Sequence, residues 1–363
     1  MTLVLVDGTG AVLGALPPFA VPEPHRQQVA AVVDGARSHY GAEVVVLRLL
    51  RADGPAVTYL AEVSTVDRLL SPVDVESRPH PLRAPYAEVG GPAASLAWAQ
   101  GVLGPLSARQ LRTWNLSSIW RLAHRSGIAW LKEVPAFYRH EGAVLVWLGD
   151  HLPGLGPTVL GVDGGRVLLD DVPGEDRYGA PADERLAMLA ALHRIQRAAA
   201  GDLPALRSLG VPDDDLEARI RDVAQRYGYP DLLDGLDERL AEAAAAGLPG
   251  TLVHGDFHPG NVRGSVILDW GDCRLGNPGF DLMRMVERLP AEQREGLAER
   301  WCAWWRAAVP GCRPERALDA LEPLSALRNA AEYAGFLERI EPSEHVYHRD
   351  DVPEWLEQAR AGR

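Results

Sequence analysis

The spacing of apolar residues changes between residues 175 and 181 and separates the chain into two parts. Before this point, apolar residues occur in short runs with strand-like alternation, separated by turns rich in Gly, Asp, Asn and Ser. After it, apolar residues recur every three or four positions, as on the buried face of a helix. This spacing predicts helices over residues 182–200, 213–227, 231–246, 291–309, 314–340 and 352–361. We therefore predict an α+β protein with a strand-rich first part and a mainly helical second part.

The strand-rich part contains a small first domain and a second group of strands. Residues 1–71 predict two strands, a helix over 25–40 and two further strands, but they contain no motif with recognisable chemistry. The second group comprises strands over 110–114, 119–123, 128–134 and 166–169, with helices over 93–103 and 137–148. Between the two groups lies a stretch rich in Pro and Gly without a period, which is typical of a linker. We therefore expect four segments: a small α+β domain (1–71), a linker (72–92), a strand-rich lobe with its hinge (93–174) and a helical lobe (175–363).

Composition and charge narrow the classes of function. The chain has 363 residues, 47% of them hydrophobic, so it can form cores of domain size, yet no apolar run reaches the roughly 20 residues of a membrane span. Its net charge of −13 argues against a nucleic-acid or anionic-membrane partner, because both require a clustered basic surface. The N-terminus lacks the basic and apolar regions of a signal peptide, and the cysteines make no disulfide framework. We therefore expect a cytoplasmic protein, whose oligomeric state the sequence does not indicate.

The stretch from residue 252 to 282 carries the most distinctive chemistry. An apolar run leads into Asp256, a Pro-Gly turn is followed by Asn261, and a second apolar run ends at Asp269. Two carboxylates and one amide oxygen on a strand–loop–strand unit suit phosphoryl transfer from a magnesium nucleotide. One carboxylate accepts the proton of the acceptor hydroxyl, whereas the other carboxylate and the amide oxygen hold Mg²⁺.

Two motifs in this stretch resemble those of aminoglycoside phosphotransferases and choline kinases, which are relatives of protein kinases. His254-Gly255-Asp256 followed by Asn261 resembles the catalytic loop, and Ile267-Leu268-Asp269-Trp270 resembles the metal-binding strand end. The resemblance implies a bilobal protein-kinase-like fold and an ATP- and Mg²⁺-dependent O-phosphotransferase that acts on a hydroxyl of a small molecule. It also implies that Asp256 is the catalytic base and that Asn261 and Asp269 bind Mg²⁺. The expected supports of the loop are His254, His258 and Asp281.

Lys132 is the only lysine among the 37 basic residues, and it lies near the end of the third predicted strand of the lobe. Because Arg has a wide planar head, a single Lys in an arginine-rich chain indicates a position that requires a compact ammonium group. A lysine on the inward face of a strand needs an anion, since an unpaired buried charge costs several kcal/mol. Glu141 shares one helical face with apolar residues and can supply this anion. The pair matches the lysine and glutamate that position the ATP phosphates in the family.

The resemblance also implies nucleotide and acceptor contacts that rest on position alone. Ser117 and Ser118 belong to the turn that covers the ATP phosphates, although this turn lacks the glycines of protein kinases. Main-chain groups of Asp170, Asp171 and Val172 would bind adenine at the hinge. In the last stretch before residue 348, carboxylates lie beside aromatic residues, which suits a cationic or amino-bearing acceptor. The predicted acceptor contacts are Glu332, Tyr333, Glu341 and Tyr347.

Three alternatives remain open from the sequence. A peptide- or protein-directed kinase would use the same catalytic residues and differ only in its acceptor groove. The same fold can also serve a nucleotide-binding regulator without activity. A zinc hydrolase would use a His/Asp cluster, but this interpretation gives no role to Asn261 or Lys132. The cluster would consist of His254, Asp256, His258 and Asp269.

Overall fold

The computed structural model describes residues 1–22, 25–64, 70–75 and 78–362, and the chain divides into two compact units. The first unit comprises residues 1–139, 159–171 and 337–347, and the second comprises residues 140–158, 172–336 and 348–363. Strands dominate the first unit and helices the second. The protein is therefore of the mixed α+β class that its sequence predicts.

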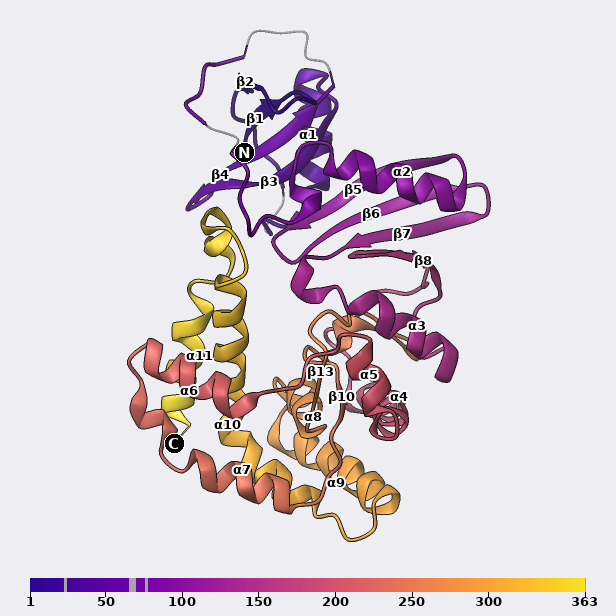
Figure 1. Cartoon of the computed structure of the whole chain (residues 1–363), viewed down its shortest axis with the longest axis vertical. Coiled ribbons are helices and arrows are strands. Elements are labelled where there is room, and N and C mark those ends of the chain that lie inside the picture. Colours follow the sequence, from indigo (N-terminus) through magenta and orange to yellow (C-terminus); the bar gives the residue numbers. More distant parts are fainter. Residues whose placement is uncertain (23–24, 65–69, 76–77, 363) are drawn as a thin grey trace. The chain divides into compact units, whose positions relative to one another are not determined.

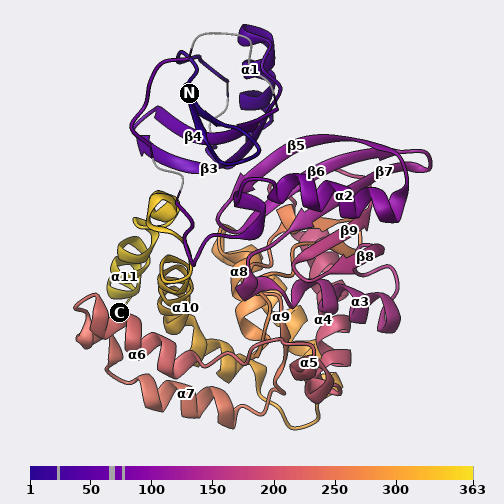
Figure 2. The same cartoon turned by 45° about the horizontal axis from the view of Figure 1, so that its top comes forward.

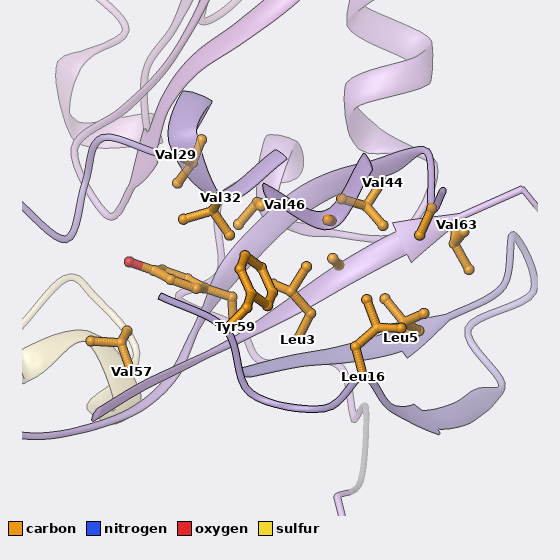
Figure 3. Packing of buried hydrophobic residues seen from close by; sticks show 14 of the residues in the cluster. Leu3, Leu5, Leu16, Val29, Val32, Val44, Val46, Val57, Tyr59 and Val63 are labelled. Atoms are coloured by element: carbon orange, nitrogen blue, oxygen red, sulfur yellow. The ribbon is translucent and has the colours of Figure 1, made fainter. Parts of the chain in front are cut away.

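The first unit begins with a four-stranded sheet in the order β2-β1-β4-β3. Its strands are β1 (Thr2–Val6), β2 (Val12–Ala15), β3 (Val44–Asp53) and β4 (Ala56–Val63); β1 and β4 are parallel and the other neighbours antiparallel. Helix α1 (Ala30–Tyr40) covers one face, where Leu3, Leu5 and Tyr59 pack in the cluster shown in Figure 3. Val4 and Leu60 belong to a second buried cluster on the opposite face. Burial of both faces explains why these strands read as continuous apolar runs.

A five-stranded antiparallel sheet follows in the order β5-β6-β7-β9-β8. Its strands are β5 (Leu106–Trp114), β6 (Ser117–His124), β7 (Gly127–Glu133), β8 (Val159–Asp163) and β9 (Arg166–Asp170). Helix α2 (Gly91–Leu103) lies along one face of this sheet (Figure 1), where Ala99 packs with Trp120, Leu131 and Leu168. Lys132 lies on the other, less buried face, because successive residues of a strand point in opposite directions.

The N-terminal sheet does not stand apart from this second sheet. Val29 donates a backbone hydrogen bond to the Leu111 carbonyl of β5 (2.9 Å). The Gln110 side chain, which is 4% exposed, accepts a hydrogen bond from Val46 N (2.9 Å) and donates one to Val46 O (2.7 Å). The helix predicted from residue 25 therefore begins only at Ala30, because the residues before it pair with β5. Both sheets belong to one compact unit, where the sequence predicts a separate first domain.

Three 3₁₀ helices lie in the described part of the first unit, and one of them is η2 (Ala136–Tyr138). Tyr86 of η1 (Pro85–Ala87) is 1% exposed and donates a hydrogen bond to Trp114 O (2.8 Å), so part of the expected linker contributes to the core. Tyr347 of η5 (Pro342–Tyr347) packs edge-on against the Trp114 ring, with 5.6 Å between the ring centroids. Tyr347 also packs against the cluster beneath α1. Segments far apart in the sequence thus meet around Trp114.

The second unit is mainly helical. Its helices are α3 (Glu141–His151), α4 (Ala182–Ala200), α5 (Leu203–Ser208), α6 (Leu216–Arg226), η3 (Pro230–Leu233), α7 (Leu236–Ala245), η4 (Pro259–Asn261), α8 (Gly279–Val286), α9 (Ala291–Ala308), α10 (Pro314–Leu337) and α11 (Asp351–Ala361). Helix α11 lies beside α10 in both views (Figures 1 and 2). Two small antiparallel ladders carry the motif stretch: β10 (Thr251–Val253) pairs with β13 (Arg274–Gly276), and β11 (Val262–Arg263) pairs with β12 (Val266–Ile267).

Helices α5 and α8 are absent from the sequence prediction, because short helices give too few repeats of the apolar period. The long helices α4, α9 and α10 begin at the predicted residues. Within the described part of the chain, no helix combines the length and apolar character needed to cross a membrane.

Candidate active site

Asp281 of α8 holds the loop that follows β10 in place. This side chain lies in the first turn of α8, is 1% exposed, and accepts hydrogen bonds from two backbone groups of the loop. His254 N donates to Oδ2 (2.9 Å), and Gly255 N donates to Oδ1 (3.0 Å). Gln196 of α4 donates a third bond to Oδ2 (2.9 Å). Asp281 therefore sets the backbone just before Asp256.

His254 connects the loop to the next strand. Its side chain is fully buried, Nδ1 accepts a hydrogen bond from Asp256 N (3.3 Å), and Nε2 lies 2.8 Å from the Leu268 carbonyl oxygen. This arrangement places the ring proton on Nε2, since a carbonyl oxygen can only accept. The ring therefore joins the backbone at Asp256 to the backbone immediately before Asp269.

The hairpin of β11 and β12 brings the two predicted metal ligands to one end of the same ladder. Leu268 N donates to Asn261 O (2.8 Å), so Asp269 follows directly after a residue bonded to Asn261. The Asn261 side chain donates through Nδ2 to Asp256 O (3.0 Å), which leaves its amide oxygen for another partner. Asp269 has a φ of 62° and is the only residue other than glycine with positive φ in the described ranges. Such strain concentrates at functional sites.

Asp256 is held by a guanidinium group and an imidazole ring. Arg284 Nε donates to Oδ1 (2.9 Å), and His258 Nε2 lies 3.3 Å from Oδ2. Burial raises the pKa of Asp256, but the hydrogen bond from His258 and the charge of Arg284 outweigh burial, and the pKa lies well below its usual range. His258 is itself stacked on Tyr178, with 5.1 Å between the rings. Asp256 is therefore an oriented, ionised carboxylate whose side chain remains 38% exposed.

Arg284 is the main residue of this site that the sequence prediction misses. It lies one turn after Asp281 on α8, so one short helix provides both the anchor of the loop and the partner of Asp256. The spacing of three residues between Asp281 and Arg284 places them on one helical face. This spacing is the signal in the sequence, but it becomes informative only once α8 is known to be a helix.

The predicted lysine–glutamate pair is divided between the two units. Glu141 is the first residue of α3, is 1% exposed, and accepts a hydrogen bond from Trp270 N (3.1 Å). Its carboxylate is thus tied to the residue immediately after Asp269. Lys132 lies on β7 in the first unit, half-buried. The pairing of Lys132 with Glu141 stays a prediction.

The residues predicted to contact the nucleotide lie in the first unit or at its border. Ser117 and Ser118 are 5% and 2% exposed, and their hydroxyls accept hydrogen bonds from the indoles of Trp114 and Trp120, both at 3.1 Å. A hydroxyl that accepts one bond keeps its own proton for donation, so contact of these two serines with phosphates stays a prediction. Asp170 ends β9, and the border between the units falls between Asp171 and Val172. The Asp171 carboxylate accepts a hydrogen bond from Trp130 Nε1 (2.7 Å), and adenine binding by this segment stays a prediction.

The predicted acceptor residues are divided between the two units, and their role in acceptor binding stays a prediction. Glu332 is bonded to Arg219 and Arg274; burial raises its pKa, but these arginines outweigh burial and lower it to about 2. Glu341 belongs to the first unit, where Arg48 (3.4 Å) and Arg83 (2.9 Å) neutralise it. Tyr347 is also in the first unit, within the core described above. The carboxylates expected to attract a cationic acceptor therefore serve structural ion pairs.

Tyr333, on α10, has a pKa that Asp256 of the loop affects. Burial raises its pKa, and the negative charges of Asp351 and Asp256 raise it further. Its ring packs edge-on against Phe336, with 5.6 Å between the centroids. The phenol is therefore a neutral hydrogen-bonding group on the helical side of the site.

The arrangement of these residues does not favour the zinc-hydrolase alternative. Both nitrogens of His254 are engaged with the backbone, so this residue does not contribute a ligand beside Asp256. Across the described residues, no three His, Cys, Asp or Glu side chains gather as a metal-binding group. The arrangement instead combines one oriented carboxylate with an amide and a carboxylate on an adjacent hairpin.

Comparison with known proteins agrees with this arrangement. Residues 107–343 match the model of a family described as the phosphotransferase enzyme family. No curated protein matches the chain. Among solved structures, the chain resembles the macrolide 2'-phosphotransferase MphH from Brachybacterium faecium, with 18% identity and a TM-score of 0.52 over 71% of this chain and 97% of that one. The choline kinase LicA from Streptococcus pneumoniae has 13% identity and a TM-score of 0.52, over 73% of this chain and 99% of that one.

A complex of APH(2")-IIia with GDP and kanamycin also matches, with 16% identity and a TM-score of 0.52, over 76% of this chain and 99% of that one. At such low identity these structures show the fold alone, and they confirm the predicted protein-kinase-like fold. The family match covers more than half of the chain and includes both sequence motifs and α8. The chain belongs to the phosphotransferase enzyme family.

Proposed function

We propose that the chain transfers the γ-phosphate of ATP, with Mg²⁺, to a hydroxyl group of a small molecule. The observation that carries this proposal is the joining of Asp256, Asn261 and Asp269 by a few short bonds. Asn261 binds the backbone of Asp256 (3.0 Å), and His254 links Asp256 to the residue before Asp269. Structures of the same fold in complex with GDP and with ATP also support a nucleotide as the donor.

The chemistry of the donor set fits Mg²⁺. Asn261 and Asp269 present an amide oxygen and a carboxylate, and Mg²⁺ prefers a few oxygen ligands from the protein, with phosphates and water completing its shell. Asp269 adopts a strained backbone conformation that nearby bonds hold in place, which is the kind of feature expected at a ligand. When bound, the metal would neutralise charge on the β- and γ-phosphates.

Asp256 would orient the acceptor hydroxyl. The hydroxyl oxygen forms a bond to the γ-phosphorus, the bond between that phosphorus and the β–γ bridging oxygen breaks, and the hydroxyl proton passes to the Asp256 carboxylate. Because Arg284 and His258 lower the pKa of Asp256, its carboxylate is a weak base that acts mainly by holding the hydroxyl in line. In this proposal Lys132 contacts the α- and β-phosphates, and Glu141 orients Lys132.

A nucleotide-consumption screen tests this proposal. Purified protein is incubated with Mg²⁺ and either ATP or GTP, together with separate panels of hydroxylated small molecules and short peptides, and the diphosphate formed is measured. We expect turnover that depends on one small molecule and is lost in Asp269→Ala. Turnover with peptides alone would favour the protein-directed alternative, and restoration of the metal-stripped protein by zinc but not magnesium would contradict the proposal.

A further inference from the structure

A cavity of about 510 Å³ in the second unit reaches the catalytic loop. Gly255, the residue before Asp256, lines it together with Arg284, whose Nε lies 2.9 Å from Asp256 Oδ1. The volume falls within the roughly 300–1,000 Å³ of small-molecule sites. A molecule in this cavity therefore lies next to the ion pair of the carboxylate that would receive its hydroxyl proton.

Two helices give the cavity uncharged hydrogen-bonding groups and one aromatic face. Helix α10 contributes Ser325 and Asn329, which are four residues apart and therefore on one face. Helix α11 contributes Trp355 and Gln358, which are three residues apart. Hydroxyl and amide groups both donate and accept hydrogen bonds, as sugar hydroxyls do. An indole face offers a flat apolar surface for the C–H face of a saturated ring.

The charged groups on the cavity wall do not favour a polycation. Arg284 is already paired with Asp256 and Glu287, and Arg328 with Asp214 (3.4 Å). The remaining charged lining residues are Arg294 and Glu322, which have opposite signs. A site for an amino-bearing antibiotic needs an excess of carboxylates, whereas this wall is nearly neutral.

We propose that this cavity binds the acceptor and that the acceptor is an uncharged, hydroxyl-rich ring compound of the saccharide class. The inference rests on the proposed function, because it takes Asp256 as the group that receives the hydroxyl proton. Trp355 supports the ring, and Asn329 and Gln358 select hydroxyl groups. Arg284 is a positioning residue, since it holds Asp256 at the edge of the cavity.

The first test uses matched variants of the full chain. Trp355→Leu removes the indole face, although Phe280 still lines the cavity, and is expected to raise KM for a neutral saccharide roughly tenfold, while KM for ATP stays within about twofold. Trp304→Leu is the control, because Trp304 is another half-buried tryptophan of the second unit but does not line the cavity. Gln358→Ala is compared in the same way with Gln225→Ala, another exposed glutamine on a helix. Equal effects of Trp355→Leu and Trp304→Leu would overturn the inference.

The second test compares ligands that differ in charge. Glucose and sucrose are compared with glucosamine and kanamycin, by saturation-transfer NMR for binding and by diphosphate release for turnover. We expect the neutral compounds to bind and to be phosphorylated in preference to the amino compounds. Absence of binding by neutral saccharides, or a tenfold preference for the amino compounds, would overturn the inference. A third outcome is that the wild type binds saccharides without phosphorylating them and that Trp355→Leu abolishes this binding. That outcome would support saccharides as ligands of the cavity but contradict the proposed phosphotransfer.

Discussion

The free energy of unfolding should depend on pH near neutrality because of Glu344. Glu344 lies in η5, is 5% exposed, and accepts a hydrogen bond from the backbone of Leu49. Burial and the negative charge of Glu341 raise its pKa from 4.5 to about 8, although Arg48 and Arg83 act in the opposite direction. The native protein therefore keeps a proton on Glu344 at neutral pH.

The size of the effect follows from the two pKa values. Between pH 4.5 and about 8, the native state binds a proton that the unfolded state has released, so the free energy of unfolding falls as pH rises. The contribution is complete below about pH 4.5 and is lost as pH passes through about 8. The slope for one fully shifted group is about 1.4 kcal/mol per pH unit, so the protein should lose roughly 2 kcal/mol between pH 6 and pH 7.5.

Glu344→Gln removes the titration but keeps the shape and an acceptor for Leu49 N. Urea unfolding at intervals between pH 5.5 and 8 should show the variant gaining stability relative to the wild type as pH rises. Glu354→Gln, at an exposed position on α11, is the control and should leave the pH dependence unchanged. Parallel pH profiles for the wild type and Glu344→Gln would mean that Glu344 is ionised in the native protein, and the reasoning would fail.

Two further substitutions test the proposed contact of Lys132 with the nucleotide phosphates and the packing of the loop at Gly255. Lys132→Arg keeps the charge but replaces a compact ammonium with a planar fork, so kcat/KM should fall by about 10²-fold, the order lost with one charge-stabilising donor; near wild-type kinetics would remove Lys132 from the phosphate site. Gly255→Ala should lower the midpoint of thermal unfolding by more than Gly264→Ala. Both residues have positive φ, so both substitutions strain the backbone. Only at Gly255 would the new Cβ also clash, because it would lie 2.4 Å from Asp272 O, whereas a Cβ at Gly264 has no neighbouring atom within 4 Å. The strain shared by both costs about 1–3 kcal/mol, and equal midpoints in thermal unfolding would show that the close approach is unimportant.

Elements with a strong local period were predictable from the sequence. Strands β5 to β7 and helices α4 and α9 repeat their apolar residues often enough for periodicity to identify them. The close approach of Asp256, Asn261 and Asp269 was predictable for a different reason, because these residues are close in sequence and resemble a known motif. Their catalytic and metal-binding roles stay predictions. The support from Asp281 follows from the same motif stretch.

Contacts between distant segments were not predictable. The stretch from Glu332 to Tyr347 resembles an acidic, aromatic acceptor site, yet its first carboxylate pairs with Arg274 and its last residue packs against Trp114. No local pattern reveals an arginine that is far away in the sequence but near in the fold. Arg284 was missed for another reason, because α8 is too short for its apolar period to be recognised in the sequence.

The most direct test of the proposed phosphotransfer is the rate constant of Asp256→Asn with the acceptor found in the screen. Asn keeps the size of the side chain but cannot take the hydroxyl proton, and its loss of charge weakens the contact with Arg284. The account predicts that kcat falls by roughly 10²–10⁴-fold, the usual effect of losing a positioned base, while the Kd of the nucleotide changes by less than about twofold. An unchanged kcat in Asp256→Asn, measured on protein that binds nucleotide normally, would contradict the central claim.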